Sequence, residues 1–188
     1  NPATSTIYSF ATGGANQPPV LNAIGNKSIN EGQLLEFTVS ASDPDNDPLT
    51  YSANLSSLPS GASFNQTSHT FSWTPGYDQA GTYSNVRFQV SDGQATDSED
   101  IIITVNDFNP PPVLGSIGNK SVKKRQLLQF TISATDPNND PLTYSANLSS
   151  LPSGASFNQT SRTFSWTPSS SHVGIYTNVH FEVTDGQS

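Results

Sequence analysis

The sequence predicts an all-β protein made of two tandem β-sandwich domains. The first observation is an internal repeat: residues 47–68 recur letter for letter as residues 140–161, at an offset of 93 residues and without a gap. A repeat of this length is a duplicated domain rather than a short solenoid unit. The second observation is composition, because hydrophobic residues make up only 32% of the chain while glycine and proline are abundant. Such a chain suits short strands joined by turns and leaves little scope for long helices.

The first three predicted strands are bounded by proline, glycine and acidic turns. Residues 20–24 read as a strand between the proline pair at 18–19 and a glycine-asparagine pair. Residues 34–40 alternate between apolar and polar side chains, which predicts a half-buried strand. The acidic loop at 43–48 ends that strand, and residues 49–53 resume extended structure. The alternation indicates that one face of each strand is buried.

The remaining four predicted strands complete one repeat. A Leu-Pro-Ser-Gly turn at 58–61 precedes two short strands over 62–64 and 70–73. Residues 82–91 and 96–105 form two longer strands, and the Asp-Gly pair between them is a strong hairpin signal. Seven strands with turns about every 8 to 12 residues predict an antiparallel sandwich of the immunoglobulin type.

Charge and composition exclude several classes of protein. Only 12% of the residues are charged and the net charge is −8, which disfavours nucleic acid as a partner and leaves acidic clusters free to bind cations. The chain has no cysteine, so disulfides and thiolate metal sites cannot contribute. It has no methionine, even at its start, and no run of about 18 apolar residues. We therefore expect a processed chain or a segment of a longer one, without membrane insertion, from which any targeting peptide has been removed.

The second copy of the repeat stops early. Residues 185–188 match residues 92–95, so this sequence ends before any equivalent of the strand predicted over 96–105. A strand-like segment at the head of the chain, residues 6–12, falls on residues 99–105 by the same offset. We therefore expect the second domain to lack its last strand. The predicted parts are a donor strand and linker over 1–15, domain 1 over 16–108 and domain 2 over 109–188.

Enzymatic chemistry has little support. None of the three histidines, His69, His172 and His180, recurs as a histidine in the other repeat, and no Ser-His-Asp arrangement, phosphate loop or histidine-rich metal motif is visible. We expect surface histidines, no catalytic residues and therefore no enzyme. Trp73 and Trp166 occupy equivalent positions, which favours a place in the sandwich core over a sugar-binding platform.

The repeats resemble the cadherin-like and immunoglobulin-like tandem domains, including the dystroglycan-type cadherin-like domains, of large bacterial surface and secreted proteins. The residues that carry the resemblance are 41–45 with 49–52 downstream, and the acidic linker at 105–110. The resemblance covers nearly all of both repeats. It implies the fold strongly and the function weakly, because such modules serve as spacers, adhesins and accessory domains alike.

The resemblance also implies calcium as a cofactor. In cadherin-like proteins the ions lie between domains and take oxygen ligands from the base of one domain, the linker and the acidic loop of the next. The ligands implied for the internal junction are Glu31, Asp107, Asn109, Asp136, Asn138 and Asp140, and the matching loop of domain 1 offers Asp43, Asp45 and Asp47. The alternative is that these loops are turns stabilised by their own side chains, with no ion.

A basic cluster takes the place of an acidic residue in domain 2. The residue that matches Glu31 is Lys124, and it is flanked by Lys123 and Arg125. If another subunit docks there, the acidic loop at 43–47 would meet these cations instead of a bridging calcium. Attraction of this kind orients a partner more than it adds affinity.

A sandwich domain without its last strand has an open edge that captures a complementary strand. In phase with the last strand of domain 1, the side chains of Tyr8, Phe10 and Thr12 point inward and that of Ile7 points outward. Donation within one chain is geometrically awkward, because domain 1 is already attached at the near end of domain 2. We therefore predict a secreted, extracellular structural subunit whose partner is another copy of itself. Head-to-tail donation would build a filament with calcium-stiffened domain junctions.

A second hypothesis is a spacer or carbohydrate-binding module from a larger repeat-rich adhesin or secreted polysaccharide-degrading enzyme. Under this hypothesis the partner is carbohydrate or another cell surface, and the point at which the sequence stops is incidental.

Overall fold

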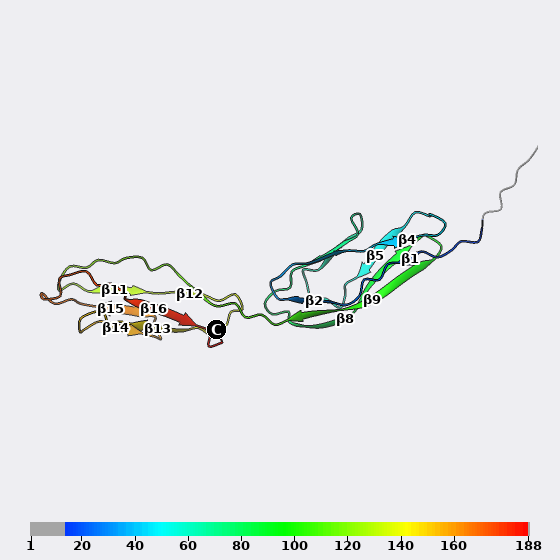
Figure 1. The fold of residues 1–188 in the computed structure, drawn as a ribbon. Helices are drawn as coiled ribbons and strands as arrows, with labels where there is room; N and C mark the ends of the chain where they lie inside the picture. The colour runs from blue at the N-terminus through cyan, green and yellow to red at the C-terminus, as the bar shows by residue number, and fades with distance from the viewer. Residues whose placement is uncertain (1–13, 188) are drawn as a thin grey trace, which may run out of the picture. The chain divides into compact units, whose positions relative to one another are not determined.

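The computed structural model describes residues 14–187, and all regular structure in that range is β-strand. The backbone contacts divide the chain into two compact units, one ending at Asp107 and the other beginning at Phe108 (Figure 1). The predicted all-β fold with two tandem domains is confirmed.

Domain 1 contains two facing sheets and a short strand pair. The larger sheet has the order β2-β9-β8-β5 and the smaller one β3-β7-β6, while β1 pairs with β4. The strands are β1 (Val20–Leu21), β2 (Lys27–Asn30), β3 (Leu35–Thr38), β4 (Ala41–Ser42), β5 (Thr50–Asn54), β6 (Ser63–Asn65), β7 (Thr70–Trp73), β8 (Gly81–Ser91) and β9 (Thr96–Asn106).

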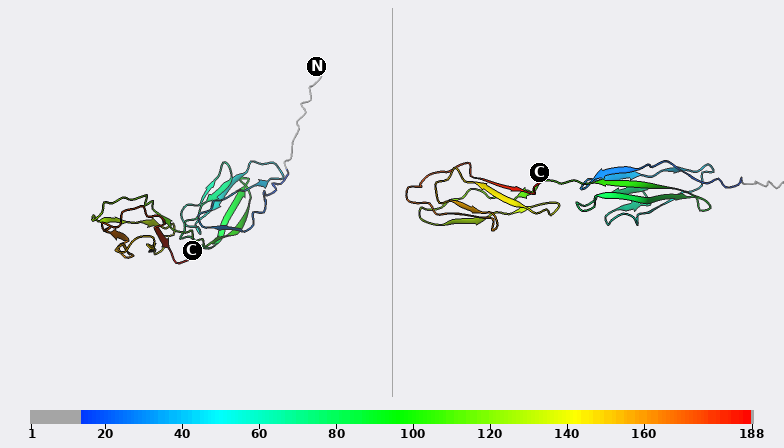
Figure 2. Two further views of the ribbon diagram at one scale, coloured as in Figure 1. Left: turned by 60° about the vertical axis from the view of Figure 1, so that its left-hand side comes forward. Right: turned by 90° about the horizontal axis from the view of Figure 1, so that it is seen from below.

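Strand β9 lies inside the larger sheet and pairs with a strand on each side. It runs antiparallel to β8, from Gly81↔Val105 to Ser91↔Thr96, and the two long green strands lie side by side in Figure 2. On its other edge it runs parallel to β2, with Ile29 beside Val105. The expectation of a wholly antiparallel sandwich is wrong at this point. The sequence does not reveal β2, because this short edge strand is held by backbone bonds to β9 and its polar residues show no apolar alternation.

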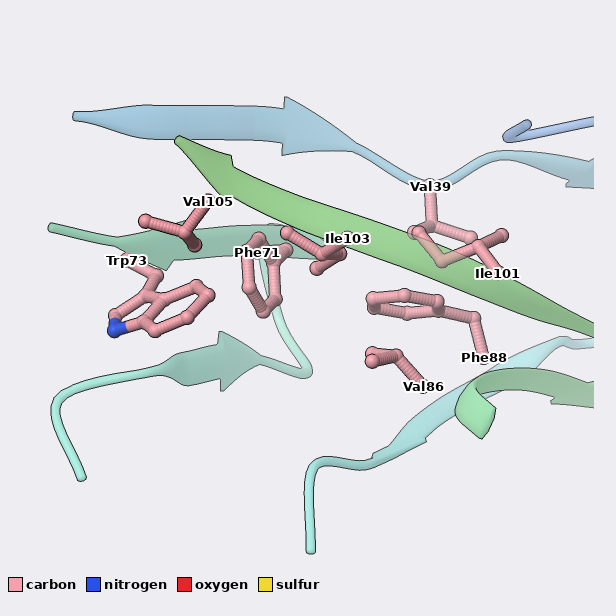
Figure 3. Packing of buried hydrophobic residues seen from close by; sticks show 8 residues of the cluster. All are labelled: Val39, Phe71, Trp73, Val86, Phe88, Ile101, Ile103 and Val105. Atoms are coloured by element: carbon pink, nitrogen blue, oxygen red, sulfur yellow. The ribbon is translucent and has the colours of Figure 1, made fainter. Parts of the chain in front are cut away.

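The core of domain 1 lies between the two sheets. Eight buried side chains from both layers point into it (Figure 3), and three of them, Ile101, Ile103 and Val105, come from β9 and are at most 2% exposed. Burying one such side chain stabilises the fold by about 1.5–3 kcal/mol. Strand β9 therefore supplies a large part of the hydrophobic stabilisation of domain 1.

Domain 2 repeats this framework over residues 108–187. The sheets are β11-β15-β14, β13-β16 and β10-β12. The strands are β10 (Val113–Leu114), β11 (Leu128–Thr131), β12 (Ala134–Thr135), β13 (Thr143–Asn147), β14 (Ser156–Asn158), β15 (Thr163–Trp166) and β16 (His180–Thr184).

The aromatic centre is the same in both domains. The ring centroids of Phe37 and Phe71 lie 5.0 Å apart in domain 1, and those of Phe130 and Phe164 lie 5.0 Å apart in domain 2. Trp73 is 1% exposed, and its equivalent Trp166 is 6% exposed. The prediction that the two tryptophans belong to the core is confirmed.

The two domains differ where β9 contributes to the sheet. Between residues 108 and 187 no strand occupies the places of β2 and β9, and β16 has 5 residues where β8 has 11. Residues 120–123 match β2 but form no strand, because the ladder partner of β2 is β9. Residues 174–179, which match the first half of β8, are also not in a strand.

Candidate strand-binding groove and acidic loops

A groove opens into the core of domain 2 at the place that β9 fills in domain 1. Its cavity volume is about 1340 Å³, and its walls come from residues 117–130, 164–168 and 172–181, together with Leu151. We call it the domain 2 groove. Its apolar lining includes Val122, Phe130, Phe164, Trp166, Val179 and Phe181. Of these residues only Trp166 was singled out from the sequence, although the 93-residue offset relates all of them to the neighbours of β9.

Apolar side chains are uncovered along this groove. Ile175 is 93% exposed and Val173 is 75% exposed. Phe181 is half-buried, whereas its equivalent Phe88, on the strand next to β9, is fully buried. A contiguous apolar surface of this kind marks a site that another element covers.

The groove is also bordered by an unpaired strand edge. In domain 1, β8 pairs with β5 on one side and β9 on the other. In domain 2, β16 pairs with β13, and its other edge has no strand partner within residues 108–187. Open edges of this kind template pairing with a further strand.

Basic side chains line one end of the groove. Lys123 and Lys124 are among the lining residues, and both are exposed. The N–H of Arg125 donates to the carbonyl of Pro168 at 2.7 Å. In domain 1 the residue that matches Lys124 is Glu31, which is 1% exposed. The two domains therefore carry opposite charges at this position, which in domain 1 follows the strand β2 that pairs with β9.

The acidic loop of domain 1 brings Asp43, Asp45 and Asp47 together. One carboxylate oxygen from each lies within 4.8 Å of the others. Asp43 Oδ1 accepts hydrogen bonds from the N–H groups of Asp45 and Asp47 at 2.8 and 3.1 Å. Asp43 Oδ2 is buried and accepts no hydrogen bond from residues 14–187. The loop is thus a side-chain-stabilised turn that also carries an unsatisfied oxygen.

The acidic loop of domain 2 holds several unsatisfied oxygens. Asp136 Oδ1 accepts hydrogen bonds from the N–H groups of Asn138 and Asp140 at 2.9 and 3.1 Å. Asn138 Nδ2 donates to the carbonyl of Phe108 at 3.3 Å, which brings the residue before Asn109 to this loop. Among residues 14–187, three buried oxygens here accept no hydrogen bond, namely Asp136 Oδ2, Asn109 Oδ1 and Asn138 Oδ1. Oxygens of this type are the ligands of hard divalent cations.

The predicted calcium ligands fall in both units. Glu31 is buried in domain 1, and its Oε1 accepts a hydrogen bond from the N–H of Gln79 at 2.8 Å. Asp107 is exposed at the end of the same unit. A joint site of these two residues with the loop of domain 2 stays a prediction. The predicted interface residues Ile7, Tyr8, Phe10 and Thr12 lie outside the described residues.

The linker before domain 1 is tied to the turn between β8 and β9. Asn16 Nδ2 donates to Asp92 Oδ2 at 3.0 Å. The N–H of Ala95 and the Asn16 amide hold the pKa of Asp92 below its ordinary value of 3.8. Because the folded-state pKa is lowered, this stabilisation is present above the ordinary value and is lost as the pH falls through the folded-state pKa. The matching pair, Asn109 and Asp185, is bonded at 2.7 Å in domain 2.

Two of the three histidines depart from the expected exposed surface positions. His69 stacks on Tyr51 with ring centroids 3.8 Å apart and is half-buried. His172 Nδ1 accepts a hydrogen bond from the N–H of Ser169 at 3.3 Å and is also half-buried. His180 is exposed, as expected. The departures arise because each half-buried ring covers an aromatic residue, Tyr51 or Trp166, which sequence spacing did not reveal.

The fold and the repeat define tandem immunoglobulin-like domains. The family model described as "Putative Ig domain" matches the chain twice, over residues 18–106 and 111–188, and the chain belongs to this family. No helix within residues 14–187 is long and apolar enough to cross a membrane.

Among curated proteins, a chitinase A of Pseudoalteromonas piscicida is 30% identical over 145 residues. The match covers 75% of this chain and 17% of the chitinase, so the chain spans a small part of that protein.

Among solved structures, the first two cadherin repeats of human protocadherin-24 are 17% identical with a TM-score of 0.44, covering 90% of this chain and 94% of that one. An endo-fucoidan hydrolase of glycoside hydrolase family 107 is 24% identical with a TM-score of 0.42, covering 95% of this chain and 28% of that one.

Proposed function

We propose that this chain is a secreted structural subunit that joins other copies of itself head to tail. Residues 1–12 of one subunit enter the domain 2 groove of the next and take the place of β9. The observation that carries this proposal is the groove itself, an apolar slot of about 1340 Å³ beside an unpaired strand edge. Backbone pairing along such an edge supplies affinity, and alternate side chains in the groove supply specificity.

The head of the chain has the side chains that such a groove needs. By the 93-residue offset, Tyr8 and Phe10 take the places of Ile101 and Ile103, which are at most 1% exposed in domain 1. Burying two aromatic rings stabilises the joined state by roughly 3 to 6 kcal/mol before entropy costs. The ladder to β16 adds net hydrogen-bond stabilisation.

The two ends of each sandwich support donation to a different subunit. In domain 1 the chain enters beside Asp92, to which Asn16 is bonded, and leaves beside Glu31, whose N–H donates to the Asn106 carbonyl. The 11 residues of β9 separate these two ends. A strand inserted in domain 2 therefore leaves at the end opposite to the entry from its own domain 1. An interface that does not close on itself in this way generates a filament.

Calcium is proposed as the cofactor that stiffens the acidic loops. The unsatisfied oxygens of Asp43 and Asp136 support this, because a buried acceptor without a partner costs free energy that a cation would recover.

The basic cluster of domain 2 is proposed to attract the acidic loop of the incoming subunit's domain 1. It consists of Lys123, Lys124 and Arg125. The net charge of −8 makes such a basic cluster an exception on this chain.

A spacer or carbohydrate-binding module of a larger secreted polysaccharide-degrading enzyme or adhesin is the second candidate. The 30% identity to a chitinase A supports it. In that setting the partner is carbohydrate or a cell surface, and the domains are not catalytic themselves. The two candidates differ in what fills the domain 2 groove.

Electron microscopy of the purified chain tests the assembly. We expect filaments from the native sequence and none from a Phe10→Asp variant, because an unpaired carboxylate in the groove costs several kcal/mol. A Ser9→Asp variant is the matched control, since that side chain points outward and filaments persist. Dispersed particles from the native chain would remove the filament proposal and favour the module.

A further inference from the structure

We infer that the turn at 117–119 fixes the register of the inserted strand, so that Ser9 lies at the Asn119 amide and Ser5 lies opposite Glu182. This inference rests on the proposed strand donation and adds a polar recognition element to it. The groove would then bind one sequence in one frame, rather than any apolar strand.

Domain 1 supplies the pattern for this contact. Asn26 Oδ1 accepts a hydrogen bond from the N–H of Ile102 on β9 at 2.9 Å. The Glu99 carboxylate, also on β9, accepts hydrogen bonds from the N–H groups of Ile24 and Gly25 at 2.7 and 2.9 Å. One turn thus holds β9 at two points three residues apart.

The same turn is present in domain 2. Residues 117–119 have the sequence Ile-Gly-Asn, as do residues 24–26, and Gly118 has a φ of 65° where Gly25 has 69°. Asn119 is exposed at the margin of the groove. The N–H groups of Ile117 and Gly118 donate to no acceptor between residues 14 and 187. The donors and the acceptor are therefore already arranged, while the strand that would meet them is not within the described residues.

Polar contacts are needed because the apolar groove alone specifies the register weakly. Side chains alternate with a period of two along a strand, so a slip of two residues keeps the same face inward. With Tyr8 and Phe10 two residues apart, such a slip still places an aromatic ring in the groove. Hydrogen bonds at fixed points distinguish the registers, because a slipped strand does not present the Ser9 N–H to Asn119 and loses that bond.

The head of the chain offers matching groups in the predicted frame. Ile102 corresponds to Ser9, whose N–H can donate to Asn119, and Glu99 corresponds to Thr6. A threonine hydroxyl accepts fewer and weaker hydrogen bonds than a carboxylate. We therefore expect Thr6→Glu to tighten subunit joining by roughly tenfold or more, since bonds to charged acceptors are the stronger ones.

Disulfide trapping reads the register directly, because the chain has no cysteine. In domain 1, Ser98 lies opposite Gln89, and these residues match Ser5 and Glu182. We expect the full chain carrying Ser5→Cys and Glu182→Cys to form covalent oligomers under mild oxidation. Pairing Ser5→Cys with His180→Cys or with Thr184→Cys tests the two registers that are shifted by two residues. Each of these pairs is expected to cross-link at least tenfold more slowly than the pair of Ser5→Cys with Glu182→Cys.

Asn119→Ala tests the polar contact within the same assay. We expect this variant to cross-link at more than one of the three positions, whereas Asn26→Ala removes the equivalent bond in domain 1 and leaves Glu182 preferred. Filaments that cross-link faster at position 180 or 184, or an Asn119→Ala variant that keeps the native preference, overturn the register and leave the strand donation standing. Absence of any assembly overturns both.

Discussion

Domain 1 and domain 2 have the same aromatic centre but differ in how completely it is covered. Phe88 is fully buried in domain 1, while its equivalent Phe181 is half-buried in domain 2. The strands around these residues have the same order in both domains, apart from β2 and β9. The comparison teaches that the smaller sheet and the central aromatic cluster form without the last strand. That strand closes the core and also orders two neighbouring segments.

The largest expected effect comes from opening domain 1. Ile103 is fully buried on β9, so Ile103→Asp places a carboxylate in the core and costs at least about 4 kcal/mol. We expect domain 1 to melt far below its normal temperature. Each domain contains one tryptophan, so a Trp166→Phe background lets Trp73 fluorescence report domain 1 alone. Ile102→Asp is the control, because Ile102 is 39% exposed and faces outward. Equal melting of both variants would contradict the role assigned to β9.

The next effect comes from closing domain 2. A peptide of residues 1–12, added to the full-length Phe10→Asp chain, is expected to raise the melting temperature of domain 2. Ligand at about 100 times its Kd stabilises by about 2.7 kcal/mol, which corresponds to roughly 10–20 °C for a domain of this size. Trp166 fluorescence in a Trp73→Phe background provides the measurement. A peptide carrying Phe10→Asp is the control, and an equal shift from both peptides rules out a specific donor strand.

Calcium removal is expected to have a smaller effect, and one that both domains share. A ligand that binds the folded state stabilises it by mass action, so chelation lowers both melting temperatures. Asp136→Asn reduces this sensitivity in domain 2, and Asp43→Asn reduces it in domain 1. Single-tryptophan chains measure each domain separately. Melting curves that do not respond to calcium or chelator would remove the calcium proposal.

The smallest effect concerns the rate of joining. Replacing Lys123, Lys124 and Arg125 with serine is expected to slow assembly several-fold at low salt and little at high salt, because salt screens such attraction. Light scattering at two ionic strengths measures the rates. Arg162→Ser, which changes an exposed charge outside the groove lining, is the control. The same slowing at both ionic strengths argues against electrostatic steering.

The sequence was sufficient to predict most of the framework. The exact repeat predicted the two domains and the equivalent positions of the tryptophans. The alternation over 34–40 and the Asp-Gly turn each reflect a local backbone requirement, so the main strands could be predicted as well. Strand β2 could not, because its residues show no apolar alternation and its order depends on a distant partner. Most of the groove lining was not predicted either, since residues such as Ile175 form a site only when the place of β9 is considered in three dimensions. The 93-residue offset relates these residues to the neighbours of β9, but those neighbours are known only from the structure of domain 1.

The parallel pairing of β2 with β9 has a consequence for folding kinetics. The bond from Ile102 to Asn26 joins residues 76 positions apart, so domain 1 must close a long loop before this contact stabilises it. Topologies rich in such non-local contacts fold slowly. Within residues 108–187, domain 2 has the Asn109–Asp185 bond of the same separation but no strand ladder of this kind, so its framework is expected to form sooner than the closed sheet of domain 1. The domain with the open strand edge is then expected to form first, so that its groove is present while the sheet of domain 1 is still being completed.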